Sequence, residues 1–407
     1  MTAGGTVPAP LPYRRNPHRP ADPADELREL CASQPIPRVP LSSGTLAWLV
    51  TRYEDARRVL ADPRFSSNLT MPGTALPEPG QRTLAEELQD RQPGTFLEYD
   101  PPDHTRLRAM VAGEFTSGAM QRLRPRIEAI VRECLDQTQA AGPPADLVET
   151  FALPVPSQVI CELLGVPLDD GFDFAGHTVV MTDLMATAEQ SLAARDAMRG
   201  YMRELVAKHR RNPGDTILGR LIRAHGDEVT DEELVGIGNL LLIAGHETTA
   251  MMLGLGTLVL LQHPDQMALL RDDPSLVPSA VEELLRYVSI ANHGAIRTAV
   301  EDIEVSGQLI HKGDAVAVSI PMVNRDGKRY AEPDRFDVTR AAKRSQLAFG
   351  YGIHHCVAAP MARLELQIAY PALLARFPAL RLAVAVEQVP IRTSNATHGV
   401  FALPVSW

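Results

Sequence analysis

Hydrophobic residues recur at helical spacing through the middle of the chain, from residue 102 to residue 285. A spacing of three to four residues is typical of helices that bury one face. Prolines interrupt the pattern at Pro143-Pro144, Pro167, Pro213 and Pro264. Because proline lacks a backbone N–H and clashes with the preceding turn, each interruption predicts the end of a helix. The middle of the chain therefore predicts a series of separate helices.

Short strands are predicted on both sides of this helical region. The apolar run from Leu46 to Arg52 predicts a strand, and Tyr53 to Leu60 follows it with helical spacing. Further along, Ile303 to Val305 and Ala315 to Ile320 are short alternating runs typical of strands. A last helix is expected from Ala359 to Leu374. The predicted fold class is therefore mainly α with small β-sheets.

Neither an internal repeat nor a bare linker divides the chain, so we expect residues 21–407 to form a single domain. Residues 1–20 are rich in proline and polar residues, which predicts a flexible segment that is neither a signal peptide nor a membrane anchor. The stretch from Asn68 to Gly94 holds many Pro, Gly and Gln residues and predicts a long loop. Such a loop in a compact protein usually has a function, such as shaping a pocket.

The longest predicted helix runs from about Asp231 to Gln262. Thr230 and Glu233 have the spacing of a capping box at its start, and Pro264 stops the pattern. The span is long enough to cross a membrane, but three polar residues near its centre would be costly in hydrocarbon, namely Asn239, His246 and Glu247. We therefore expect a buried helix that crosses the core of a water-soluble protein.

Composition narrows the choice of partner and compartment. The formal net charge of −10 disfavours a nucleic-acid partner, because phosphate binding usually needs a basic face. The cysteines have no short repeated spacing and predict neither a disulfide framework nor a zinc ribbon: Cys31, Cys134, Cys161 and Cys356. We expect a reducing, cytoplasmic environment.

The strongest local signal for chemistry is the stretch Phe349–Cys356, which contains two glycines two residues apart. Glycines allow a tight turn with positive φ angles. A cysteine directly after such a turn and before a helix lies near backbone N–H groups, which favour a thiolate, and a thiolate is a suitable ligand for haem iron. For an isolated cysteine, a buried inert side chain would be the better interpretation. Zinc is disfavoured, because the adjacent His354, His355 and Cys356 cannot easily supply three ligands.

This stretch, together with Ala362–Glu365, resembles the haem-binding loop of the cytochrome P-450 family. The resemblance implies the single-domain cytochrome P-450 fold, with haem b (iron protoporphyrin IX) between the long helix at about 231–262 and the helix that follows the cysteine. It also implies that Cys356 is the iron ligand and that Phe349 and Gly350 contact the haem. Three further matches occur in the family's order and span most of the chain.

The second match is Ala244–Thr249 on the long helix. Gly245 would let the helix open or lie against a flat cofactor. The resemblance implies that Ala244 contacts the haem and that Glu247 and Thr248 relay protons to dioxygen there. Without the family, a pair that caps or stabilises a kink explains these residues equally well.

The third match is Glu283 and Arg286, which lie three residues apart on one helix face. Most such pairs are solvated and contribute little. The resemblance implies instead a buried pair that Arg335 completes, with the structural role of holding the cysteine loop in place.

The fourth match runs from Asp100 to Arg108 and opens a helix. His104 and Arg108 are four residues apart and share a face. Two donors on one face suit an anionic group, although ordinary surface cations are the simpler interpretation. The resemblance implies that both hold haem propionates, together with Arg297 and His354.

Two residues depart from the family pattern. Ala358 stands where glycine is usual, and its methyl group could tilt the haem or the following helix. Gln346 stands where many relatives carry histidine, but its amide can still donate a hydrogen bond, so we expect a tuned pocket.

The four matches together imply a haem-thiolate monooxygenase that inserts one oxygen atom from O2 into a small apolar organic molecule, as in the tailoring of bacterial secondary metabolites. The sequence has no Gly-rich dinucleotide or flavin segment, so a separate ferredoxin and ferredoxin reductase are expected to supply electrons. The alternatives are a peroxide-driven peroxygenase, a non-catalytic haem-binding protein, and a cofactor-free helical binding protein. Glu247 and Thr248 favour the monooxygenase over the peroxygenase.

Substrate contacts are expected by likeness to the family. The segments 68–94 and 178–187 should line the pocket. Five individual residues should also contact the substrate: Leu241, Ala244, Asn292, His293 and Val400. Asn292 and His293 could orient a substrate oxygen or could form hydrogen bonds within their own turn.

Overall fold

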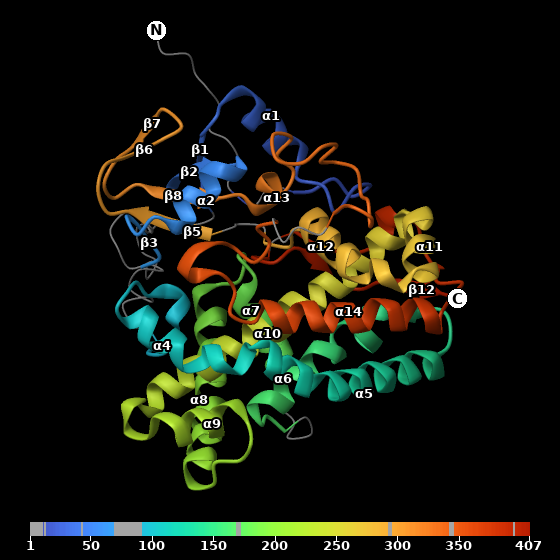
Figure 1. The fold of residues 1–407 in the computed structure, drawn as a ribbon, viewed down its shortest axis with the longest axis horizontal. Helices are drawn as coiled ribbons and strands as arrows, with labels where there is room; N and C mark the ends of the chain where they lie inside the picture. The colour runs from blue at the N-terminus through green and yellow to red at the C-terminus, as the bar shows by residue number, and fades with distance from the viewer. Residues whose placement is uncertain are drawn as a thin grey trace.

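The computed structural model describes residues 11, 14–41, 44–68, 92–167, 172–291, 295–341, 346–393 and 395–407. Helices form most of the molecule, and the largest sheet lies at one side of the helical part (Figure 1). Of the predicted loop at 68–94, only residues 68 and 92–94 are among those described. The substrate-contact predictions for Asn292 and His293 also lie outside the described residues.

The helices occupy the middle and the C-terminal part of the chain. The α-helices are α1 (Asp25–Ser33), α2 (Tyr53–Ala61), α4 (Asp103–Ala112), α5 (Ser117–Ala141), α6 (Pro154–Leu164), α7 (Phe174–Thr182), α8 (Ala188–Arg211), α9 (Ile217–His225), α10 (Asp231–Gln262), α11 (Pro264–Asp272), α12 (Val277–Val288), α13 (Ile320–Val323) and α14 (Ala359–Arg376). The predicted breaks are confirmed, because α5 ends before Pro143, α6 before Pro167, α8 before Pro213 and α10 before Pro264.

The strands of the described residues are short and form four small sheets. They are β1 (Arg38–Pro40), β2 (Leu46–Val50), β3 (Phe65–Ser66), β4 (Ala145–Asp146), β5 (Ala295–Ala299), β6 (Ile303–Val305), β7 (Gln308–Ile310), β8 (Ala315–Val318), β9 (Arg381–Leu382), β10 (Ile391–Arg392), β11 (Gly399–Val400) and β12 (Pro404–Ser406). The largest sheet has the order β1-β2-β8-β5-β3, in which β2 and β8 are parallel and the other pairs antiparallel. β10 and β11 form an antiparallel hairpin whose register pairs Ile391 with Val400.

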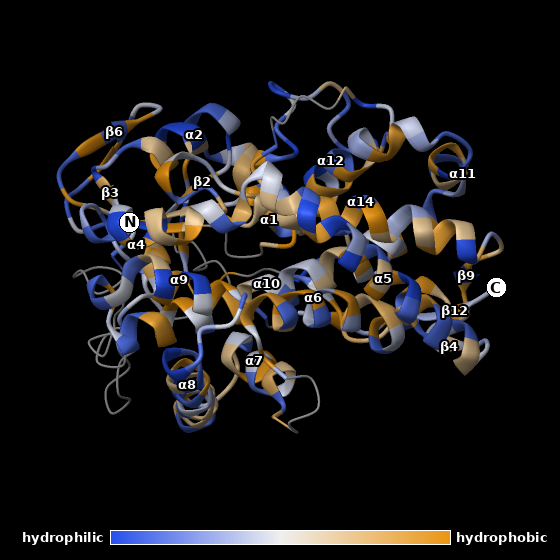
Figure 2. Ribbon diagram, turned by 60° about the horizontal axis from the view of Figure 1, so that its bottom comes forward, coloured by the Kyte–Doolittle hydropathy of each residue, from blue (hydrophilic) through white to orange (hydrophobic). Residues whose placement is uncertain are grey.

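The long helix α10 runs through the core, as predicted, and packs against α6, α8, α12 and α14. Its capping box is present, because Thr230 accepts a hydrogen bond from the Glu233 N–H and the Glu233 side chain accepts one from the Thr230 N–H. Figure 2 shows hydrophobic residues on α10, α6 and α5 where these helices lie together. Among the described residues, no helix has both the length and the apolar character needed to span a membrane.

Candidate active site

The cysteine loop has the backbone shape that its glycines predict. Gly350 and Gly352 have φ angles of 71° and 75°, a region that side chains with a Cβ rarely adopt. A Cβ at Gly352 would also lie 2.4 Å from the carbonyl oxygen of Leu60, so this position needs glycine on two grounds. The Cys356 N–H donates to the carbonyl of Phe349 at 2.9 Å, which closes the loop directly before α14.

Opposing effects act on the Cys356 thiol. Burial raises its pKa, whereas the N–H groups of Ala358 and Ala359 and the charges of Arg108 and Arg363 act to lower it. The N–H groups are those expected before a helix N-terminus. A coordinating metal ion deprotonates a thiol outright, so the donor set around the sulfur fits a thiolate ligand for iron.

Buried polar contacts hold the cysteine loop from behind. Gln346 donates from Nε2 to Glu282 at 3.0 Å and accepts from the Ala348 N–H at 2.6 Å. Arg363, on α14, donates to the same Glu282 at 2.5 Å. The amide of Gln346 therefore fixes the loop to Glu282 of α12, and Arg363 joins α14 to the same carboxylate. The side-chain amide of Gln346, which we expected to tune the haem pocket, therefore donates its hydrogen bond to another residue of the protein.

The second departure, Ala358, fits its position without strain. It caps α14 with a φ of −88° and a ψ of 8°, which any residue can adopt. Its partly buried methyl group packs against the main hydrophobic core. The structure gives no sign that the helix needs glycine at this point.

Four basic side chains predicted to bind propionates come together beside the loop. The rings of His104 and His354 lie 4.2 Å apart between centroids, and Arg108 donates to the carbonyl of His355 at 2.5 Å. Arg297, on β5, is 8% exposed, and its charge lowers the pKa of both histidines. Three chain segments that are far apart in the sequence thus meet at one place.

Three ring nitrogens of this cluster lack a hydrogen-bond partner among the described residues. Neither ring nitrogen of the buried His104 makes a hydrogen bond with a described residue, and the same holds for Nε2 of His354. Burial is the main reason that the pKa of His354 falls to about 3 and that of Arg297 to about 10. Buried donors without acceptors are costly, and a ligand with carboxylates, such as the propionates of haem, would satisfy them.

The central turn of α10 offers an open surface. Ala244 is exposed, although most of α10 is buried, and Thr248 lies one turn further on the same face. The Thr248 hydroxyl donates to the carbonyl of Ala244 at 2.7 Å. The expectation that Gly245 lets α10 open or lie against a flat cofactor is wrong, because a Cβ at Gly245 would lie 2.9 Å from Ile160 of α6. Gly245 allows α6 to pack closely against α10.

Comparisons with known proteins show the family of the chain. Residues 177–401 match the model of the family described as Cytochrome P450. The chain is 43% identical to cytochrome P450-SU2 of Streptomyces griseolus over 98% of this chain and 96% of that protein. It is 46% identical to vitamin D3 dihydroxylase of Streptomyces griseolus over 92% and 91% of the two chains. The crystal structure of CYP105P1 in complex with filipin I matches with a TM-score of 0.89 and 41% identity, covering 98% of this chain and 99% of that one.

The chain belongs to the cytochrome P450 family. It is a haem-thiolate monooxygenase with the single-domain P450 fold, and its cofactor is haem b. The orphaned donors of His104 and His354 and the N–H groups around Cys356 fit that cofactor. The family thus explains two features that would be unfavourable in a protein without a ligand.

The acid of this P450's α10 motif lies in a buried network that the sequence did not reveal. Glu247 is 4% exposed, and its Oε1 pairs with Nη1 of Arg392 on β10 at 2.8 Å. The hydroxyls of Thr182 and Thr397 donate to the same oxygen at 2.9 Å and 3.1 Å. The other oxygen, Oε2, makes no hydrogen bond with any described residue. Arg392 belongs to no sequence motif, so only the fold identifies it as the partner of Glu247.

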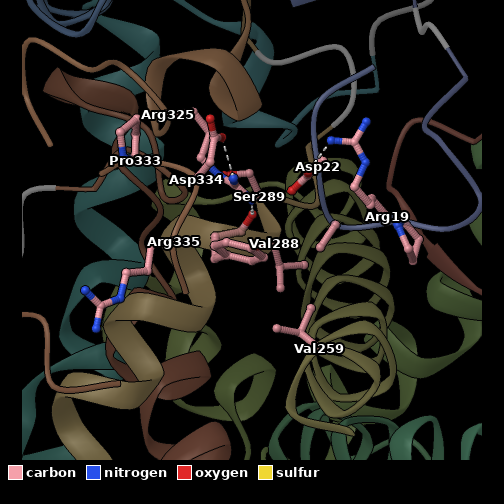
Figure 3. A network of polar contacts seen from close by, with 12 residues as sticks. Arg19, Asp22, Val259, Val288, Ser289, Arg325, Pro333, Asp334 and Arg335 are labelled. Carbon is pink, nitrogen blue, oxygen red and sulfur yellow. Dashed lines mark hydrogen bonds and ion pairs between the residues drawn. The ribbon is translucent and has the colours of Figure 1, made fainter. Parts of the chain in front are cut away.

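The buried pair on α12 is confirmed, but its third member is corrected. Glu283 and Arg286 are almost completely buried and lie 2.7 Å apart. The Arg335 side chain is exposed and pairs with Glu332, and only its backbone carbonyl accepts from Arg286. Arg340 donates to Glu283 at 3.1 Å instead. Figure 3 shows the Arg335 side chain pointing away from the neighbouring polar network.

The described substrate-contact candidates differ in accessibility. Ala244 is exposed, whereas Leu241 is 5% exposed and Val400 has no exposed surface. Val400 packs against α10, because a Cβ at Gly254 would lie 3.0 Å from its Cγ2. The prediction for Val400 is therefore wrong in this conformation. Within the predicted segment 178–187, Val179 and Met185 are exposed apolar side chains.

Proposed function

We propose that this P450 hydroxylates a bulky, apolar secondary metabolite in the bacterial cytoplasm, with electrons from a separate ferredoxin and ferredoxin reductase. Two relatives support the substrate class, because one is named a vitamin D3 dihydroxylase and one was crystallised with filipin I. The chain has no Gly-rich dinucleotide segment that could supply the electrons itself.

We propose Cys356 as the iron ligand, with His104, Arg108, Arg297 and His354 holding the propionates. When bound, the haem supplies activation of dioxygen and transfer of one oxygen atom to the substrate. The protein's own task is then to orient the substrate, to exclude bulk water and to deliver protons.

The observation that carries the proton-delivery proposal is the asymmetric setting of Glu247. Three donors anchor Oε1, while Oε2 makes no hydrogen bond with a described residue. The neighbouring Thr248 uses its proton on Ala244, which leaves its oxygen lone pairs able to accept a hydrogen bond. An anchored carboxylate next to such a hydroxyl suits proton transfer to the open face of α10.

The test replaces Thr248 with valine, which keeps the shape but removes the hydroxyl. The reconstituted Thr248→Val variant should consume electrons while product per electron falls by about ten- to a hundredfold and peroxide accumulates, since general acid–base groups typically contribute factors of this order or more. Thr257→Val is the matched control, because Thr257 lies on the same helix and makes the same bond to the carbonyl four residues before it.

Three outcomes would contradict the proposal. Equal coupling in Thr248→Val and Thr257→Val would remove the proton-delivery role. Turnover with hydrogen peroxide alone, at the rate seen with ferredoxin and reductase, would favour the peroxygenase. A reduced protein that lacks the red-shifted carbon monoxide spectrum of a thiolate ligand would contradict the assignment of Cys356.

A further inference from the structure

The segment that precedes α1 lies against the end of α12. We call residues 14–22 the N-terminal strap. Arg15 donates to the carbonyls of Val288 at 3.0 Å and Ser289 at 2.8 Å, and within the strap to Ala21 at 3.3 Å. The last carbonyls of a helix lack partners within the helix, and a cation there also interacts favourably with the helix dipole. Arg15 therefore caps α12 from a distant part of the sequence.

The chain leaves α12 in an unusual conformation that this cap supports. Ser289 has a φ of 44°, although it is not glycine. Its hydroxyl donates to the carbonyl of Arg286 and accepts from the Asn324 side chain, both at 2.9 Å. Such a backbone conformation persists only where the surroundings fix it. The direction of the chain after α12 thus depends on Arg15 and Asn324.

A second contact joins the strap to the other end of the molecule. The ring of His398, which is 2% exposed, donates from Nε2 to the carbonyl of Pro20 at 2.7 Å. Burial lowers the pKa of His398 well below its ordinary value. The backbone N–H of His398 donates to the carbonyl of Ile290 at 2.6 Å, directly after the α12 cap.

The strap is itself fixed to the core. Asp22 pairs with Arg325 at 3.2 Å, and Arg325 also donates to the carbonyl of Tyr287 at 3.0 Å. Figure 3 shows Asp22 on the chain segment that passes near Ser289 and Arg325. The strap therefore has a fixed position from which its contacts can place other segments.

The residue next to His398 reaches the active site. Thr397 donates to Oε1 of Glu247 at 3.1 Å, and Ala291 forms an antiparallel bridge with Thr397. Two adjacent residues of one short segment thus face opposite ways, with His398 against the strap and Thr397 against the acid. Hydrogen bonds joined by short stretches of backbone therefore connect Arg15 and Pro20 to Glu247.

We infer that the N-terminal strap is a positioning element for proton delivery, and that Arg15 is its decisive residue. Arg15 and the carbonyl of Pro20 hold segments 289–291 and 397–398 at a fixed separation, and this separation lets Thr397 reach Glu247. The inference rests on the proposed role of Glu247, but the placement of the two segments can be measured without it.

The test compares Arg15→Met with Arg19→Met in the haem-loaded protein. Arg19 belongs to the same strap, is half exposed, and among the described residues pairs with Asp22 and Asp25, so it is the matched control. Arg15→Met should raise amide hydrogen exchange of Ile290 to Ala291 and of His398 by about tenfold or more, because a charged donor to two carbonyls is lost. Arg19→Met should leave this exchange unchanged.

The second measurement is product formed per electron consumed. Arg15→Met should lower this ratio and release more peroxide, and Arg15→Lys should restore it in part, which a change in stability alone would not do. If Arg15→Met fails to take up haem, His398→Leu removes the Pro20 contact and should give the same two effects.

Unchanged exchange in these segments with either variant would overturn the inference. Increased exchange with unchanged coupling would also overturn it, because the strap would then be structural only. A wild-type protein that forms no product would instead refute the proposed function, and the exchange result would still stand.

Discussion

The buried ion pair between Glu247 and Arg392 gives a quantitative prediction. The side chains are 6% and 2% exposed, and removal of one partner leaves a buried charge without compensation. Arg392→Met should therefore lower the free energy of unfolding by about 3–5 kcal/mol, and Glu247→Gln should have a similar effect. The double variant leaves neither charge, so its loss should be smaller than the sum of the two by about 2–3 kcal/mol.

The assay is urea unfolding of the haem-loaded single and double variants, followed by absorbance and far-ultraviolet circular dichroism. The pair Arg376–Asp136 is the control, because its side chains are 29% and 61% exposed. Removing this surface pair should cost less than about 1 kcal/mol. If the losses at Arg392 and Glu247 were additive, the two charges would not stabilise each other, and the network around Glu247 would have been misread.

Two further predictions concern buried carboxylates. Arg340→Met should lower the free energy of unfolding by about 1–3 kcal/mol, because the buried Glu283 carboxylate loses one of its donors. Arg335→Met should change the free energy of unfolding by less than about 0.5 kcal/mol, because the Arg335 side chain is exposed. If chemical denaturation showed the larger loss for Arg335→Met, Arg335 and not Arg340 would be the third member of the buried pair. Glu365 makes no hydrogen bond with a described residue, and burial raises its pKa to about 8. The folded state then binds more protons than the unfolded state between about pH 4.5 and pH 8, so the wild type should lose stability relative to Glu365→Gln as pH rises through this range. Parallel stability curves for the two proteins would show that the carboxyl group is solvated or paired.

Local sequence signals predicted those parts of the structure that depend on neighbouring residues. The capping box at Thr230 and Glu233 and the glycine turn before Cys356 are set within a few positions, and both are present. Arg335 and Arg340 are equally basic and five residues apart, so only the folded irregular segment decides which of them reaches Glu283.

Long-range contacts escaped the sequence for the same reason. Arg392 lies 145 residues from Glu247, and Arg15 lies 273 residues from Val288. Neither arginine lies in a recognisable motif, and an arginine in an isolated sequence is usually exposed. Only for Glu247 could the sequence have predicted that a partner exists, since a carboxylate within an apolar helix needs one.

The geometry of a helix separates the roles of Glu247 and Thr248. Adjacent residues on an α-helix point about 100° apart, so Glu247 and Thr248 leave α10 in different directions. Thr248 shares the face of the exposed Ala244, whereas Glu247 points toward Thr182, Arg392 and Thr397. In the proton delivery that we propose, a proton that enters at Glu247 passes around the helix to reach the side of Thr248. Because Oε1 is anchored by three donors, we propose Oε2 as the atom that begins that transfer.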